Sequence, residues 1–266
     1  MRKTKWITSL AAFVLVSIAC VQFSGYNAKQ KYVEVSKGLS VPVGNCVISE
    51  WEADVDSDGK PDKIYVYGEK KNKEDDYAER INLAVVYAKN GFVKKTNVSH
   101  IKGYVGGVEV RDFTDNKNND VLLKIYTDAD KSVMSAFIAD FGQEIPKNIM
   151  GDSRGINPDF SFAKGWILNC SLSNGQQFSV NLEKKKQILI EKGIFDEVGE
   201  LLKNEKVYAK YFCDINALDY DGDSQYELEG VQKVVAGQDE TELFKMHSVQ
   251  KFSGKTWGLV KIEVKY

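Results

Sequence analysis

From Lys31 onward the chain consists of short alternations of apolar and polar residues, interrupted by Gly, Asn and Asp. The stretches "KIYVYG" at 63–68, "INLAVVYA" at 81–88 and "FSVNLE" at 178–183 are examples. A period of two between turn residues is typical of β-strands, and about fifteen segments follow it. One stretch, "DEVGELLKNE" at 196–205, has the composition of a helical turn. The pattern therefore predicts a mainly β chain.

Three Asp-rich loops recur along the chain, each directly before a predicted strand. They read "DVDSDGKPD" at 54–62, "DFTDNKNND" at 112–120 and "DYDGDSQYE" at 219–227. The first two begin 58 residues apart (54 to 112), and the last two 107 apart (112 to 219), close to twice that period. A glycine turn follows each loop, at Gly91, Gly142 and Gly254. The recurrence predicts a unit of loop, strands, hairpin and strand, with a fourth unit that lacks an acidic loop between the second and third.

The fold class expected from this repeat is mainly β, a small propeller-like or irregular β-repeat assembly of antiparallel sheets over residues 31–266. Units of this kind bury their apolar faces by stacking on neighbours. With 266 residues and 43% hydrophobic content, the chain can form a substantial core. Seven units of about sixty residues would exceed this length, so a smaller assembly is expected.

The acidic loops have the spacing of a calcium-binding loop. Calcium takes six to eight oxygen ligands, which a curled backbone supplies when carboxylates stand at alternate positions. Unscreened carboxylates at this density repel one another, so an ordinary turn would avoid them. The ligands predicted in the first loop are Asp54, Asp56, Asp58, the Lys60 carbonyl and Asp62, and those in the third are Asp219, Asp221, Asp223 and Glu227. Calcium is the cofactor expected from both loops.

The middle loop has fewer charges. It offers oxygens at Asp112, Thr114, Asn116 and Asp120, of which only the first and last are carboxylates. One interpretation is a weak calcium site. The other is a turn held by Asx hydrogen bonds without metal, because Asp, Asn and Thr side chains readily bond to nearby backbone.

The sequences "DVDSDGKPDKIYV" and "DYDGDSQYEL" resemble the calcium loops of FG-GAP or VCBS repeats, as in the integrin α N-terminal propeller. The order of a signal, three Asp loops and a closing "KFSGKTW" hairpin is also similar to exported proteins of Gram-positive spore-forming bacteria that carry such repeats. The resemblance implies a β-propeller-like fold, structural calcium, and a role in surface adhesion or envelope organisation.

Residues 1–30 have the pattern of an export signal. Arg2, Lys3 and Lys5 precede an uncharged run from Trp6 to Val21. Three outcomes remain open: cleavage near Cys20, lipidation of Cys20 in the lipobox-like "SIAC", or an uncleaved anchor. In each case the protein is exported, either extracellular or attached to the outer face of the cytoplasmic membrane, and meets the membrane only through this segment.

Composition excludes several classes of protein. Lys plus Arg of 36 against Asp plus Glu of 38 gives a net charge of -2, so nucleic-acid binding is not expected. Four cysteines without a CxxC motif and two distant histidines exclude a zinc site of usual spacing. The chain has no G-x-S-x-G, H-E-x-x-H or P-loop motif. Cys170 and Cys213 lie in apolar surroundings, typical of small core residues.

These observations favour a non-enzymatic binding or structural module at the cell envelope, whose partner is cell-wall polymer or another envelope protein. Trp51, Trp166 and Trp257 could stack on sugars, although Trp amid alternating apolar residues is more often core. Two alternatives stay open: a secreted hydrolase of wall polymer that uses paired carboxylates, and a spore-envelope or coat component.

Overall fold

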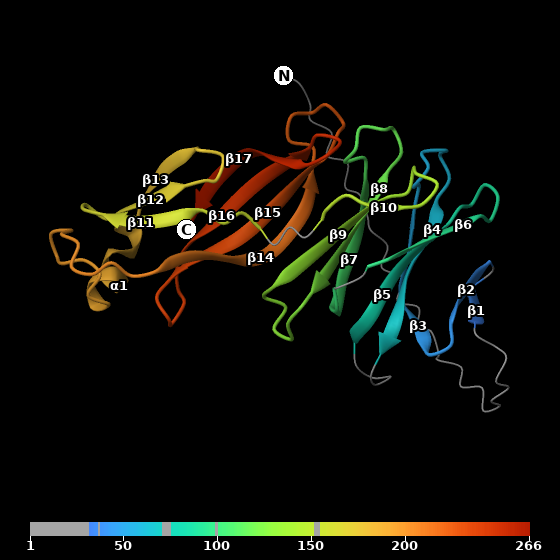
Figure 1. Ribbon diagram of the computed structural model, residues 1–266, viewed down its shortest axis with the longest axis horizontal. Helices are drawn as coiled ribbons and strands as arrows, with labels where there is room; N and C mark the ends of the chain where they lie inside the picture. Colours follow the sequence, from blue (N-terminus) through green and yellow to red (C-terminus); the bar gives the residue numbers. More distant parts are fainter. Residues whose placement is uncertain (1–31, 37, 71–75, 99–100, 152–154) are drawn as a thin grey trace, which may run out of the picture.

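The computed structural model describes residues 32–36, 38–70, 76–98, 101–151 and 155–266. The predicted export segment at 1–30, with Cys20, lies outside these residues. Among the described residues, no helix is long and apolar enough to cross a membrane. The structure is built almost entirely of antiparallel strands, which confirms the mainly β prediction (Figure 1).

Three four-stranded antiparallel units carry the three acidic loops. The first contains β3 (Asn45–Ala53), β4 (Asp62–Lys70), β5 (Tyr77–Val86) and β6 (Val93–Asn97). The second contains β7 (Gly103–Arg111), β8 (Asp120–Tyr126), β9 (Met134–Asp140) and β10 (Lys147–Asn148), and a short pairing of β5 with β7 joins it to the first. The third contains β14 (Val207–Leu218), β15 (Glu227–Ala236), β16 (Thr241–Phe252) and β17 (Trp257–Lys265). In each unit the acidic loop joins the first two strands and the predicted glycine turn joins the last two.

Smaller elements complete the fold. A hairpin of β1 (Tyr32–Ser36) and β2 (Leu39–Pro42) precedes the first unit. Between the second and third units lies a three-stranded sheet of β11 (Asp159–Ala163), β12 (Ile167–Ser171) and β13 (Gln177–Asn181). It is followed by a 3-10 turn, η1 (Glu183–Lys185), and the helix α1 (Lys186–Glu191). The expected fourth unit is therefore a three-stranded sheet.

The helical turn predicted at 196–205 is wrong. Asp196 Oδ1 accepts hydrogen bonds from the backbone N–H groups of Val198 and Glu200, at 3.0 and 2.8 Å, and forms a tight turn. Gly199 has φ of 86°, which ends any helical continuation. The helix instead forms at α1, where Leu189 packs fully buried against the last sheet.

The units stack face to face, and a separate hydrophobic core fills each space between them. The period-two pattern of β4 shows how, because Ile64 and Val66 enter the core facing the second unit while Tyr65 and Tyr67 enter the core under β1 and β2. Phe212 and Leu228 pack against Leu122 between the second and third units. A fourth core lies between the third unit and β11–β13 with α1.

The stack is open at its ends. In Figure 1 the β1–β2 hairpin lies at one end of the long axis and α1 at the other. Among the described residues, no sheet closes on itself. The expectation of an irregular assembly of antiparallel sheets is therefore confirmed in its open form.

Candidate metal loops

The three acidic loops share one backbone conformation. The fourth and sixth residues of each loop have φ between 57 and 84°, in the left-handed region. These residues are Ser57 and Gly59, Asp115 and Lys117, and Gly222 and Ser224. The fifth residue of each loop accepts a hydrogen bond from the N–H two positions later, at 2.8 or 2.9 Å. The middle loop therefore keeps the repeat conformation although it has lost charges.

The ninth residue of each loop fixes the loop to the strand that follows. Asp62, Asp120 and Glu227 are each at most 1% exposed and begin β4, β8 and β15. Each accepts a hydrogen bond from the N–H of the second residue of its loop, at 2.8 or 2.9 Å. Hydrogen bonds from N–H to a carboxylate are among the stronger ones in proteins. The ninth acid thus forms a bracket that closes the loop.

The first loop gathers three carboxylates. Asp54, Asp56 and Asp58 each offer an oxygen within 4.8 Å of the others. Asp56 Oδ1 is buried and has no hydrogen-bond partner among the residues that the structure describes. Burial, with repulsion from Asp62 and Asp58, raises the pKa of Asp56. Such a set of hard oxygens fits a calcium ion.

Asp62, predicted as a ligand of the first loop, does not belong to that group. Both oxygens of Asp62 accept backbone hydrogen bonds, from Val55 N at 2.9 Å and Ala88 N at 2.8 Å. Lys60 is exposed, and its backbone N–H donates to Asp58 Oδ1 at 2.9 Å. The structure places Asp62 as a bracket between the loop and the end of β5.

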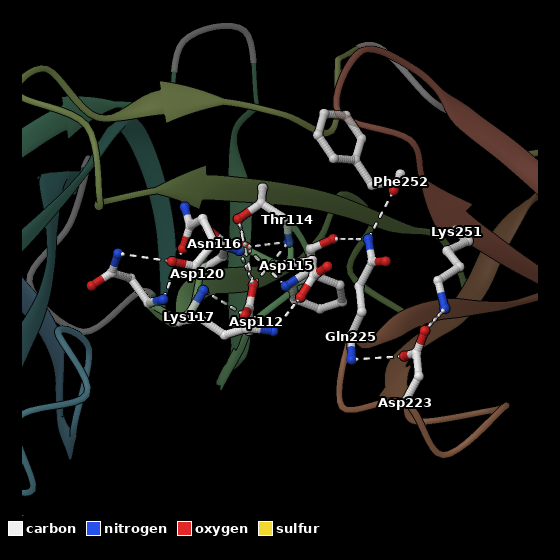
Figure 2. Close-up of polar contacts among 12 residues, drawn as sticks. Asp112, Thr114, Asp115, Asn116, Lys117, Asp120, Asp223, Gln225, Lys251 and Phe252 are labelled. Atoms are coloured by element: carbon white, nitrogen blue, oxygen red, sulfur yellow. Dashed lines mark hydrogen bonds and ion pairs between the residues drawn. The ribbon is translucent and has the colours of Figure 1, made fainter.

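In the middle loop a network of hydrogen bonds holds the turn (Figure 2). Asp112 accepts from the N–H groups of Asn116 and Lys117, at 3.3 and 2.9 Å. Asp120 Oδ2 accepts from Phe113 N and Thr114 N, whereas Asp120 Oδ1 is buried and accepts no hydrogen bond within the described part of the chain. Burial raises the pKa of Asp120 to about 7, and the negative charges of Asp140 and Asp112 add to this effect. The predicted Asx-type turn is present in this loop.

In the third loop a lysine ammonium lies among the predicted ligands. Asp219, Asp221 and Glu227 each offer an oxygen within 4.8 Å of the others. Lys251 Nζ, from β16, lies 2.8 Å from Asp221 Oδ2 and 2.8 Å from Glu227 Oε1. It also lies 2.7 Å from Asp223 Oδ2, a contact that Figure 2 shows. Glu227 Oε1 is buried and accepts no hydrogen bond in the described residues, so it meets Lys251 as an ion pair.

The residue across the hairpin from the ninth acid differs among the three units. Continuing the strand register by one pair places Tyr87 opposite Asp62, Asp140 opposite Asp120 and Lys251 opposite Glu227. The sequence interpretation missed Asp140 and Lys251. The predicted glycine turns indicated where the hairpins lie. However, Tyr87, Asp140 and Lys251 precede their turn glycines by four, two and three residues, so the sequence did not show which residues pair across each hairpin.

The three loops lie in a row along one edge of the stack. Asn119 of the middle loop donates from its backbone N–H to Val55 O, at 2.9 Å, and from Nδ2 to Asp54 O, at 2.7 Å. The N–H of Tyr226 in the third loop donates to Asp112 O at 2.7 Å. The middle and third loops thus each bind the preceding acidic loop through its backbone carbonyls.

Other predicted residues take structural positions. Trp166 is 9% exposed and packs on Phe195, at 5.1 Å between ring centroids. Trp257 is partly buried and donates from Nε1 to Ile149 O at 2.7 Å, while Trp51 packs partly buried against the first core. Cys170 is buried in the core, as predicted, and Cys213 is half-buried. The tryptophans thus contribute to packing in this fold.

Comparison with known proteins gives one similarity. Residues 159–265 match a family described as the YybI C-terminal domain. The match runs from the first residue of β11 to the last of β17, so it includes the third acidic loop and neither of the other two. Neither the curated proteins nor the solved structures include a match to the chain.

Proposed function

We propose that the protein is an exported calcium-binding β-repeat protein that acts as a non-enzymatic binding or structural module at the cell envelope. The observation that carries the proposal is the first loop. Asp54, Asp56 and Asp58 converge, and Asp56 keeps a buried oxygen that has no hydrogen-bond partner among the described residues. A dication at this point would coordinate that oxygen and offset two of the three negative charges.

Calcium would act on folding in this arrangement. The ligands come together only in the folded loop, so the free energy of binding adds to the free energy of folding. The resemblance to FG-GAP and VCBS loops favours calcium, and millimolar extracellular calcium suffices for loops of modest affinity. When calcium orders the first loop, the hydrogen bonds that Asn119 makes to that loop would also help to order the second unit.

The partner class we propose is cell-wall polymer or another envelope protein. A pocket of about 220 Å³ beside the first loop is lined by Asp56, Tyr87, Asn90, Lys94 and Asn118, among others, and offers polar groups for such contacts. The alternative of a wall-polymer hydrolase has less support. Asp120, whose pKa is strongly raised, and Asp140 form a pair of carboxylates. Asp120 is 0% exposed and Asp140 is 4% exposed, so a polymer chain cannot reach them.

Thermal unfolding of the full-length chain in chelator and in millimolar calcium tests the proposal. Calcium should raise the melting temperature by several degrees, because a ligand at 100 times its Kd stabilises by about 2.7 kcal/mol. Asp56→Asn should abolish the shift. The matched control Glu191→Gln, on α1 at the far end of the stack, should retain it. An unchanged melting temperature for the wild-type chain would refute the calcium role.

A further inference from the structure

We propose that the Lys251 ammonium is the resident cation of the third loop and takes the place that calcium has in loops of this spacing. The inference rests on the proposed function, because it concerns which of its loops need calcium. The residue opposite the ninth acid then determines whether a loop binds calcium or a lysine ammonium. The third loop then folds without metal, and the calcium requirement of the chain lies elsewhere.

The contacts of Lys251 carry this inference. Its Nζ lies 2.7 to 2.8 Å from one oxygen each of Asp221, Asp223 and Glu227. The ammonium donates hydrogen bonds to Asp221 and Asp223, and its contact with Glu227 Oε1 is an ion pair. Two of these acids, Asp221 and Glu227, also belong to the group whose oxygens converge within 4.8 Å. The ammonium therefore occupies the position at which a dication would meet the same oxygens.

Burial makes this arrangement hard to replace. Glu227 is 0% exposed, and the Lys251 side chain is 24% exposed. A buried carboxylate needs a paired charge, and Lys251 supplies it from the adjacent strand. Desolvation opposes the charge on Lys251, but its contacts with the three acids raise its pKa above the usual value. A calcium ion would first have to remove this charge from Glu227.

Among the described residues, the other two loops have no cation opposite their ninth acid, and in the middle loop the Lys117 ammonium pairs with Asp115. Tyr87 stands opposite Asp62 and brings no positive charge to the first loop. Asp140 stands opposite Asp120 and brings a further negative charge to the second. The same backbone loop is thus combined with three different partners. Only the third combination balances its carboxylates with a side chain of its own hairpin among the described residues.

Calcium stoichiometry of the full-length chain tests the inference, measured by equilibrium dialysis with radiolabelled calcium. Asp221→Asn should leave the wild-type number of bound ions unchanged. Lys251→Met should add one ion per chain, and this ion should be lost again in the double variant Lys251→Met with Asp221→Asn. Lys255→Met removes the same charge from the exposed turn between β16 and β17 and should add none.

The outcomes separate this inference from the proposed function. Loss of one ion in Asp221→Asn would show that calcium binds beside Lys251 and would overturn the inference, although the calcium role would stand. A folded Lys251→Met variant that binds no additional ion would also overturn it. A wild-type chain that binds no calcium would refute the proposed function, and a gain of one ion in Lys251→Met would then still support the inference. If Lys251→Met fails to fold, wild type and Asp221→Asn decide alone.

Discussion

Replacing Asp62 with Asn tests whether this acid stabilises its loop through hydrogen bonds, independently of calcium. Asp62 is 1% exposed, and its two oxygens accept from Val55 N at 2.9 Å and Ala88 N at 2.8 Å. The amide introduced by Asp62→Asn would have one acceptor oxygen and would turn its NH₂ group toward the other backbone donor. One charge-assisted hydrogen bond, worth about 1.5–3 kcal/mol, is lost. The backbone N–H that made it then faces the new NH₂ group, and leaving this buried donor unsatisfied costs about 1–3 kcal/mol.

We therefore expect Asp62→Asn to lower the free energy of unfolding by about 2–4 kcal/mol, since such terms overlap and do not simply add. For a chain of this length the melting temperature should fall by roughly 5–10 °C. Urea unfolding in chelator and in millimolar calcium measures the effect, which should appear in both conditions. Asp56→Asn is the matched control, and its loss should appear only in calcium. An Asp62→Asn chain as stable as wild type in chelator would refute the bracket role.

Two further predictions concern packing and pH. A Cβ at Gly230 would lie 2.1 Å from Phe212 Cε1, so Gly230→Ala should lower the free energy of unfolding in urea by about 1–3 kcal/mol. Adding Phe212→Leu to the same chain should recover part of this loss. If the losses of the two substitutions simply add, the contact is contradicted. The pKa of Asp120 is raised to about 7 in the folded state, so the native state holds an extra proton and stability in chelator should fall as pH rises from about 4 to about 7. Asp120→Asn should flatten that slope in pH-dependent thermal unfolding, and an unchanged slope would contradict it.

The sequence was sufficient for the strands and for the repeat. The alternation at 63–68 and 81–88 predicts strands whose successive side chains point to opposite faces, and β4 and β5 form over these stretches. The loop positions were also readable, because the left-handed residues and Asx contacts are local properties of nine residues. Gly91, Gly142 and Gly254 marked the hairpins for the same reason.

Features that depend on pairing distant residues were not readable. Lys251 meets Glu227 only through the register of β15 and β16, and the unequal turns of the three units hide that register in the sequence. The place of the helix was missed because Leu189 is fixed by a core drawn from β12, β15 and β16. At 196–205 local helix propensity lost to the Asx turn at Asp196.

The open stack removes a constraint that a ring of sheets would impose. A ring must contain the number of units whose wedge angles sum to a full circle, so one unit cannot be gained or lost without rebuilding every interface. Among the described residues, each core joins adjacent units, and a hairpin and a three-stranded sheet with a helix cover the two ends. Duplication or deletion of one four-stranded unit would change the interfaces that this unit makes, and no condition of ring closure would fix the number of units. The architecture is therefore free to vary in length during evolution.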